Sequence, residues 1–268
     1  MELNQNLRDL ISAAEPLWAG EAEVVRSYFK SPGRNRESDL AWLKRQCKKE
    51  FWDSIHIIDS DKGMLVGPLE MLREAIPKIE TEVDRHEILE LAESLYEEFS
   101  HYVAFADAYD FIRGEGGEKL DPLRLNQTEE WEANRILGEI RTAHRHEHGE
   151  IGRRACRFTE GGYCTLFSEC MALAGGNPQD DAIASAGKLV YEDEFGHMLK
   201  GIFDLDDGNM TDADWALLTQ LTIDQMAARI RMRNEQFGSP LSDDRIGEIL
   251  EGKIEPIRFD YDKEQLAA

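Results

Sequence analysis

Two short segments of the chain each place a glutamate and a histidine three residues apart. The first segment, YEEFSHYVA, contains Glu98 and His101, and the second, YEDEFGHML, contains Glu194 and His197. Residues at positions i and i+3 share one face of an α-helix, so each pair directs a carboxylate and an imidazole toward the same point. Ligands of these two kinds suit iron or manganese. The two segments therefore predict a metal site that is built by two helices.

A further acid precedes each motif, Glu97 in the first segment and Asp193 in the second. A single Glu-x-x-His in an acidic helical protein is usually a solvated helix face. Both copies here continue into apolar surroundings, with Phe105 after the first and Val190 before the second. Charged carboxylates in such surroundings would each cost roughly several kcal/mol unless a cation offset them. The repetition therefore favours a bound cation.

A two-metal carboxylate site in a helical bundle also needs a glutamate from each of two further helices. Glu160, in CRFTEGGYCTLF, is a lone acid on an apolar helical stripe and is the candidate from the third helix. Glu70, in GPLEMLREA, is the candidate from the first helix because apolar residues follow it at helical spacing, and Asp59 and Asp61 are the alternatives. The predicted metal ligands are Glu70, Glu98, His101, Glu160, Glu194 and His197.

The order Glu, Glu-x-x-His, Glu, Glu-x-x-His over residues 60–200 resembles the ferritin-like di-iron carboxylate superfamily. The resemblance implies two iron ions, with manganese left open, and O2 as a co-substrate. It also implies that Glu97 and Asp193 orient the histidine of the opposite motif. The residues to which it assigns a catalytic role are Glu98, His101, Glu160, Glu194 and His197.

Two departures narrow the class of di-iron protein that the resemblance implies. Small subunits of ribonucleotide reductase carry a radical tyrosine four residues after the first histidine, where this chain has Phe105. The best-known N-oxygenases carry a third histidine four residues before the last glutamate, where this chain has Val190. The implied class is an oxidase or oxygenase that works without a radical tyrosine.

The segment TEGGYC predicts where a substrate would bind. Gly161 and Gly162 follow Glu160 at what reads as a mid-helix position, where each glycine costs about 1 kcal/mol relative to alanine. The missing side chains either leave room for oxygen or substrate beside the metals or allow close helix packing. Cys164, one turn after Glu160, would face the same space. The expected pocket residues are Phe105, Gly161, Cys164, Phe167 and Val190.

Composition excludes several kinds of partner. The formal charge of −23 on 268 residues repels the phosphates of nucleic acids and anionic membrane surfaces. The four cysteines have no CxxC spacing, so reduced thiols are expected. Because the sequence has neither a long apolar run nor the pattern of a signal peptide, we expect a soluble, cytoplasmic protein.

Helical periodicity covers most of the chain and predicts an all-α fold. Helices are expected over 4–30, 37–58 with Ser38 as N-cap, 64–80, Thr81 to Ile112, Thr128 to at most Ala174, 178–203 and Thr211 to Gln236, followed by one short helix and a tail. The resemblance implies a ferritin-like four-helix bundle at about 60–203. Flanking helices at 1–58 and 211–268 would complete a single domain of residues 1–268.

These observations lead to the expectation of a non-haem di-iron oxidase or oxygenase. It would oxidise a small organic molecule by hydroxylation, desaturation, N-oxygenation or C–C cleavage. Electrons would come from an external donor such as a ferredoxin or a reductase, since no flavin or nicotinamide motif occurs, and the extra helices would form a substrate lid or a homodimer surface. The alternative is an iron-handling or peroxide-detoxifying protein, manganese catalases included, which predicts a polar, solvent-connected site.

Overall fold

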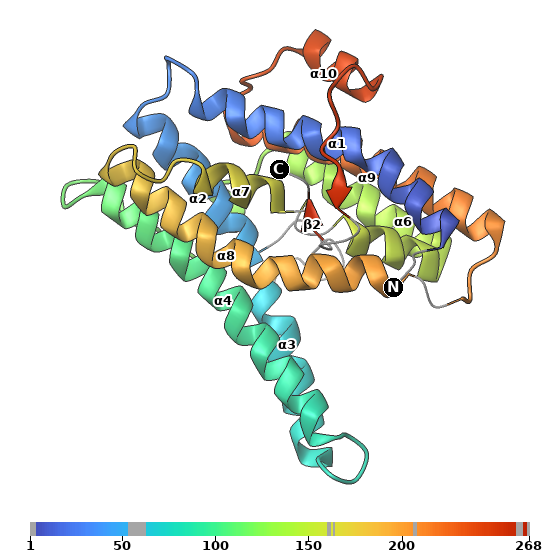
Figure 1. Cartoon of the computed structure of the whole chain (residues 1–268). Coiled ribbons are helices and arrows are strands. Elements are labelled where there is room, and N and C mark those ends of the chain that lie inside the picture. Colours follow the sequence, from blue (N-terminus) through green and yellow to red (C-terminus); the bar gives the residue numbers. More distant parts are fainter. Residues whose placement is uncertain are drawn as a thin grey trace.

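Apolar residues at helical spacing fold most of the chain into α-helices, so the all-α prediction is confirmed (Figure 1). The computed structural model describes residues 4–52, 63–159, 162, 164–205, 208–260 and 265–266. Its helices are α1 (Gln5–Phe29), α2 (Arg36–Trp52), α3 (Gly63–Ala75), the 3-10 helix η1 (Ile76–Lys78), α4 (Arg85–Arg113), α5 (Leu125–Thr128), α6 (Glu132–Phe158), α7 (Thr165–Met171), α8 (Pro178–Phe203), α9 (Asp212–Gln236) and α10 (Asp243–Leu250). Two short strands, β1 (Phe259–Asp260) and β2 (Gln265–Leu266), pair antiparallel. Across these ranges, we find no helix with the length and apolar character needed to span a membrane.

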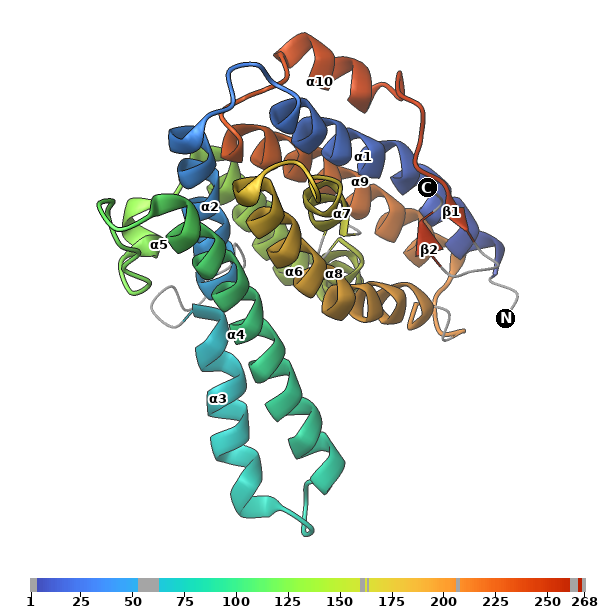
Figure 2. The ribbon, with the colours of Figure 1, turned by 60° about the vertical axis from the view of Figure 1, so that its left-hand side comes forward.

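One hydrophobic core joins the terminal helices to the middle of the chain. Helix α9 packs along both α1 and α6, and α7 packs against α8 (Figures 1 and 2). Trp18 of α1, Leu218 of α9 and Ile183 of α8 are fully buried in the same cluster. Complete burial of one such side chain contributes roughly 1.5–3 kcal/mol. Helices α1 and α9 are therefore part of the central core rather than additions around a separate bundle.

A buried ionic cluster fastens α1 to α9. The carboxylate of Glu21 accepts hydrogen bonds from Arg229 Nε at 2.8 Å and from Arg233 Nε at 2.9 Å, and all three residues are buried. Burial raises the pKa of the Glu21 carboxyl, but the two guanidinium groups outweigh this effect, so the pKa lies below its ordinary value. Gly162 lies against the cluster with a φ of 55°, and a Cβ atom there would lie 2.5 Å from Glu21 Oε2. Only glycine fits this position without strain.

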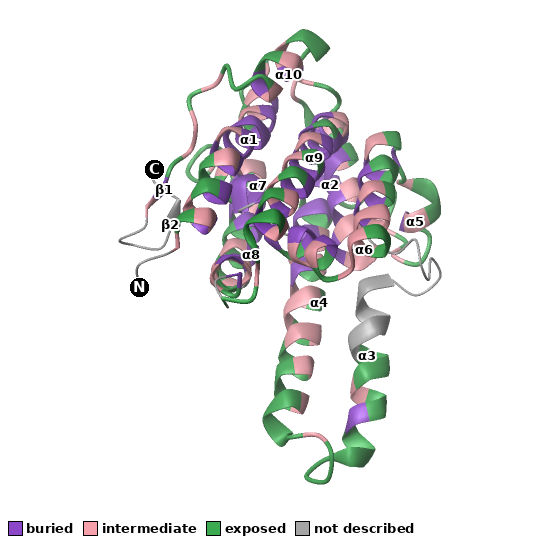
Figure 3. Ribbon diagram, turned by 90° about the vertical axis from the view of Figure 1, so that its right-hand side faces the viewer, coloured by how far each residue is buried: buried purple, intermediate pink, exposed green. Residues whose placement is uncertain are grey.

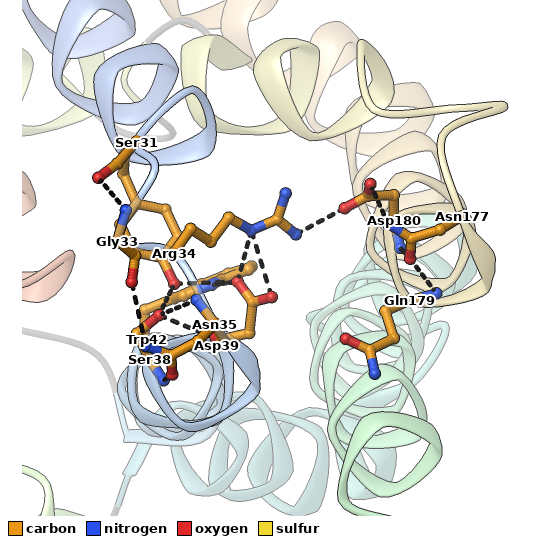
Figure 4. A network of polar contacts seen from close by, with 11 residues as sticks. Ser31, Gly33, Arg34, Asn35, Ser38, Asp39, Trp42, Asn177, Gln179 and Asp180 are labelled. Atoms are coloured by element: carbon orange, nitrogen blue, oxygen red, sulfur yellow. Dashed lines mark hydrogen bonds and ion pairs between the residues drawn. The ribbon is translucent and has the colours of Figure 1, made fainter.

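The loop between α1 and α2 anchors one end of α8. Arg34 donates from Nε to Asp39 at 2.9 Å, and its Nη2 lies 2.6 Å from Oδ1 of Asp180 in the first turn of α8 (Figure 4). Arg36, at the start of α2, donates from Nε to the carbonyl oxygen of Ile112 near the end of α4, at 2.9 Å. The first turns of α2 and α8 are therefore held near the last turn of α4.

Helix α3 and the first half of α4 project from the rest of the molecule as a two-helix arm (Figures 2 and 3). Several large apolar side chains of the arm are exposed, among them Tyr96 at 74 % and Phe99 at 47 %. The buried residues of α4 begin at His101 and continue through Phe105 and Ala108. Helix α4 thus passes from solvent into the core at the position of the first Glu-x-x-His motif.

Local capping chemistry places the starts of α8 and α9 where the sequence predicts them. Asn177 precedes Pro178 and accepts hydrogen bonds from the backbone N–H groups of the first turn of α8. Thr211 and Asp214 form a reciprocal capping box at the start of α9. Both helices also end at the predicted residues, Phe203 and Gln236.

Two predicted N-caps are wrong by a few residues. Asn35, rather than Ser38, precedes α2, and its side chain accepts the backbone N–H of Ser38 at 3.1 Å. Asp84, rather than Thr81, caps α4, and its carboxylate accepts the backbone N–H of His86. In each case a nearby Asn or Asp takes the cap. Aspartate caps better than threonine at α4, whereas asparagine and serine cap about equally well and Ser38 already lies in the first turn of α2.

The single long helix predicted from Thr128 to at most Ala174 is also wrong. Helix α6 ends at Phe158 and α7 begins at Thr165, and between them Gly162 and Cys164 have φ values of 55° and 58°. Left-handed backbone conformations of this kind interrupt an α-helix. Gly162 of TEGGYC therefore belongs to a break between helices and not to a mid-helix position.

Candidate metal centre

The imidazole of His101 lies in the interior of the protein, at the point where α4 enters the core. Its side chain is fully buried, and Phe105, one turn further along α4, is fully buried as well. Among the described residues, neither Nδ1 nor Nε2 of His101 has a hydrogen-bond partner. Buried polar atoms are nearly always hydrogen-bonded, so two such nitrogens on one ring require a specific explanation.

The contacts that hold the first turns of α2 and α8 near the last turn of α4 also bring one glutamate of each helix to the same level along the helix axes. In each of the three helices, fourteen residues separate the anchored residue from the glutamate. The pairs are Arg36 and Glu50 in α2, Ile112 and Glu98 in α4, and Asp180 and Glu194 in α8. At 1.5 Å per residue, each helix travels roughly 21 Å from the anchored end to its glutamate. Equal distances from a common end place the three carboxylates around His101.

Carboxylates from two helices face the ring nitrogens of His101. Nδ1 lies 3.9 Å from Oε2 of Glu98 and 3.5 Å from Oε1 of Glu194, and Nε2 lies 3.4 Å from Oδ2 of Asp193. Two atoms that bind one metal ion, each at about 2.0–2.2 Å, lie about 3–4 Å apart. The separations at Nδ1 are therefore of the size that a shared ion would require.

Helix α2 adds a carboxylate that sequence reasoning missed. Single ligand atoms of Glu50, Glu98 and His101 all lie within 4.8 Å of one another. Glu50 is only 9 % exposed, and Nε2 of Gln46 donates a hydrogen bond to its Oε1 at 2.5 Å. The signal was present in the sequence, because Leu43, Gln46 and Glu50 share one helical face, and an acid on a buried face was the criterion applied to Glu160.

The surroundings leave oxygen and imidazole nitrogen as the available ligand atoms. Burial raises the pKa of the Cys47 thiol, and the charge of Glu50 raises it further. Burial likewise raises the pKa of Cys164, with a further contribution from Glu194. Both thiols are therefore protonated at neutral pH in the metal-free protein, and neither supplies an atom to the group of Glu50, Glu98 and His101. Carboxylate oxygens and an imidazole nitrogen fit iron or manganese.

The structure brings some of the predicted metal ligands together and places another outside their group. It brings together Glu98, His101 and Glu194, whereas Glu70 is exposed on α3 and does not belong to the group around His101. Glu160, Gly161 and the alternatives Asp59 and Asp61 lie outside the described residues, as does the side chain of His197. Of the two acids expected to orient the histidines, Asp193 lies beside the histidine of the opposite motif and Glu97 is half-buried on α4.

The residues expected to line a substrate pocket lie in the hydrophobic core. Phe105, Cys164, Phe167 and Val190 are at most 5 % exposed and belong to the main buried cluster. The ring centroids of Phe105 and Phe167 are 6.2 Å apart, so these two side chains pack on each other. Apolar residues at helical spacing fill the interior here.

A pocket of about 560 Å³ lies instead on the side of the site nearer the arm and the end of α8. Glu98 and Glu194 form part of its wall, together with Ser94 of α4 and Met198 of α8. Most of its lining residues are polar or charged. The pocket gives a small molecule access to two of the candidate ligands.

Comparison of the chain with protein-family models, with curated proteins and with solved structures found no match. The class of protein is therefore inferred from its own fold and site.

Proposed function

We propose that the chain is a ferritin-like di-metal carboxylate protein that uses O2 to oxidise a small organic substrate. The observation that carries this proposal is the buried ring of His101, which has no hydrogen bond among the described residues but faces carboxylates of α4 and α8. A bound cation would satisfy Nδ1 and would offset the like charges of the carboxylates.

Glu50, Glu98, His101 and Glu194 are the described residues that would hold the metal ions. Glu50 takes the role that the sequence pattern gave to Glu70, and Glu160 and His197 complete the set that the motifs predict. When bound, a pair of iron ions supplies the electrons for reaction with O2 and the oxidising power for the substrate. Manganese fits the same donor atoms.

The protein's own residues would orient the ligands and control access. The Nε2 atom of His101 faces Asp193 at 3.4 Å, so a proton on Nε2 would leave Nδ1 free to bind the metal. The burial of His101 excludes water from one side of the site. Glu98 and Glu194 line the pocket, so a substrate bound there would lie next to the metal ions.

One observation favours the second candidate function, iron handling or peroxide detoxification. That function predicts a polar site open to solvent, and the pocket beside Glu98 and Glu194 is lined mostly by polar and charged residues. The apolar residues that were expected beside the metals, Phe105 and Val190 among them, are buried core residues. The polar lining also suits a polar substrate, so the two functions must be separated by their reactions.

Metal analysis of the purified protein tests the proposal first. We expect about two iron or manganese ions per chain after growth with either metal. His101→Ala and Glu50→Gln should each lose a large part of that content, and Glu70→Gln, the matched control on α3, should retain all of it. A wild-type protein without bound metal, or equal metal content in all three variants, would contradict the proposal.

The reactions of the iron-loaded protein separate the two candidate functions. Protein loaded with Fe(II) without oxygen is mixed with O2 or with H2O2, and the consumption of each oxidant is followed. An oxidase or oxygenase should consume O2 faster when a substrate occupies the pocket, and the product should carry the oxidation. Fast removal of H2O2 with no response to any organic compound would support the second function instead.

A further inference from the structure

The pocket beside the candidate metal centre contains two basic residues. Arg157 is at the end of α6, and Lys200 is in the last turn of α8. Neither has an ion-pair partner among the residues that the structure describes, whereas Arg153 and Lys188 on the same two helices pair with acids of their own helix. In a chain with an excess of acids, two basic residues in one pocket that form no ion pair with a described residue are a distinct feature, although the charge of Arg157 still acts on Glu150.

The charges around the pocket leave a positive excess once metal is bound. The carboxylates of Glu98 and Glu194 would be neutralised by the cations that they hold. Asp204 is then the remaining acid in the described lining, opposite the two positive charges of Arg157 and Lys200. Among the described lining residues the balance is one positive charge, which one carboxylate would offset.

The size and the neutral lining of the pocket also limit its ligand. A volume of about 560 Å³ lies within the range of small-molecule sites, roughly 300–1,000 Å³. Ser94 and Met198 add a hydroxyl group and an adaptable apolar side chain to the lining, and Gly201, which lies close to the backbone of Arg157, adds no side chain. The pocket therefore accommodates a small molecule with one acidic end and a less polar remainder.

We propose that Arg157 and Lys200 bind the carboxylate of a small monocarboxylate substrate and so orient the rest of that molecule toward Glu98 and Glu194. A guanidinium group forms two parallel hydrogen bonds with a carboxylate, and a lysine ammonium adds a charged donor. A phosphate dianion is less suitable, because its second charge would remain unbalanced near Asp204. This inference rests on the proposed function, since metal ions must first neutralise the two glutamates.

Calorimetric titration of the full chain tests this inference. The probes are butanoate, hexanoate, octanoate and decanoate, each paired with its primary amide, which has the same shape but no charge. They are titrated into Mn(II)-loaded protein, into metal-free protein, into the double variant Arg157→Gln/Lys200→Gln, and into the control Arg153→Gln/Lys188→Gln. We expect at least one carboxylate to bind about tenfold or more tightly than its amide. The double variant should lose that preference and the control should keep it.

The inference is overturned if no carboxylate binds more tightly than its amide, or if the double variant keeps the preference. The single variants Arg157→Gln and Lys200→Gln should each lose part of it, which gives a second measurement if the double variant unfolds. Metal content is measured on the same samples. Protein that binds metal without preferring carboxylates contradicts this inference alone. Protein that binds no metal contradicts the proposed function, and with it the neutralisation of Glu98 and Glu194 on which this inference depends.

Discussion

Replacement of Glu50 by glutamine should have opposite effects on stability with and without metal. In the metal-free protein, the carboxylates of Glu50 and Glu98 repel each other, so Glu50→Gln should raise the free energy of unfolding. In the metal-bound protein, Glu50 is a ligand, so the same substitution should lower it. A residue with a purely structural role would change stability in the same direction under both conditions.

The distances in the structure give the size of the effect. The ligand atoms of Glu50 and Glu98 lie within 4.8 Å of each other, and two like charges at that separation repel by about 3 kcal/mol at an effective dielectric constant of about 20. The Glu98 side chain is 18 % exposed, so solvent reduces this to about 1–2 kcal/mol. For a chain of this length, 1 kcal/mol changes Tm by about 2–4 °C.

Bound metal supplies the opposing effect. An ion at about 100 times its Kd stabilises the folded state by about 2.7 kcal/mol, and a variant with weaker binding loses most of that gain. Scanning calorimetry at increasing Mn(II) should therefore show that the Tm values of wild type and Glu50→Gln cross. The Tm of the variant should be the higher one without Mn(II) and the lower one when Mn(II) saturates the wild type. The control Glu70→Gln should follow wild type throughout. A variant that is less stable than wild type without metal, or that gains as much from Mn(II), would refute the reasoning.

Three further substitutions test other parts of the structure. Glu21→Gln should lower the free energy of unfolding by about 3–5 kcal/mol in urea titrations, because it leaves two buried arginines without their acid. The pKa of Glu21 in the folded state lies below the ordinary 4.5. Its contribution to wild-type stability is therefore complete above pH 4.5 and falls as the pH drops toward the folded pKa. The variant should lack this loss of stability in acid. Gly162→Ala should cost about 1–3 kcal/mol in the same titrations, because its φ is left-handed and a Cβ would lie 2.4 Å from Arg229 Nε. Gln46→Leu removes the hydrogen bond to Glu50, together with those that Gln46 Oε1 accepts from Arg233 and Gln236. It should weaken Mn(II) binding about tenfold or more in metal titrations, with an unchanged far-UV spectrum. An acid slope that survives in Glu21→Gln, wild-type stability in Gly162→Ala, or unchanged Mn(II) affinity in Gln46→Leu would contradict the corresponding argument.

The parts of the fold that sequence reasoning predicted well are those with local causes. Asn177 and Pro178 start α8, and the Thr211–Asp214 capping box starts α9, through contacts between near neighbours in the chain. The same locality holds for the Glu98–His101 pair, whose common face follows from helical spacing alone. Such features need no knowledge of how the helices pack.

The features that sequence reasoning missed depend on contacts between distant segments. Glu50 belongs to the site because the hydrogen bond from Arg36 to Ile112 fixes the position of α2 along α4. Gly162 interrupts a long apolar pattern because the buried Glu21 cluster leaves no room for a side chain. Phe105 lies one helical turn from His101, and periodicity alone cannot tell a pocket wall from a filled core.

The passage of α4 from the arm into the core has a consequence for local opening. Residues of α4 before His101 have little buried surface to hold them, whereas those after it share the main hydrophobic cluster. The free energy that keeps a helical segment closed depends on the surface that it buries. Unwinding of the arm should therefore expose Glu98 at a smaller cost than His101, although only three residues separate them. Amide hydrogen exchange along this single helix should change from fast to slow within one turn, at the two residues that begin the site.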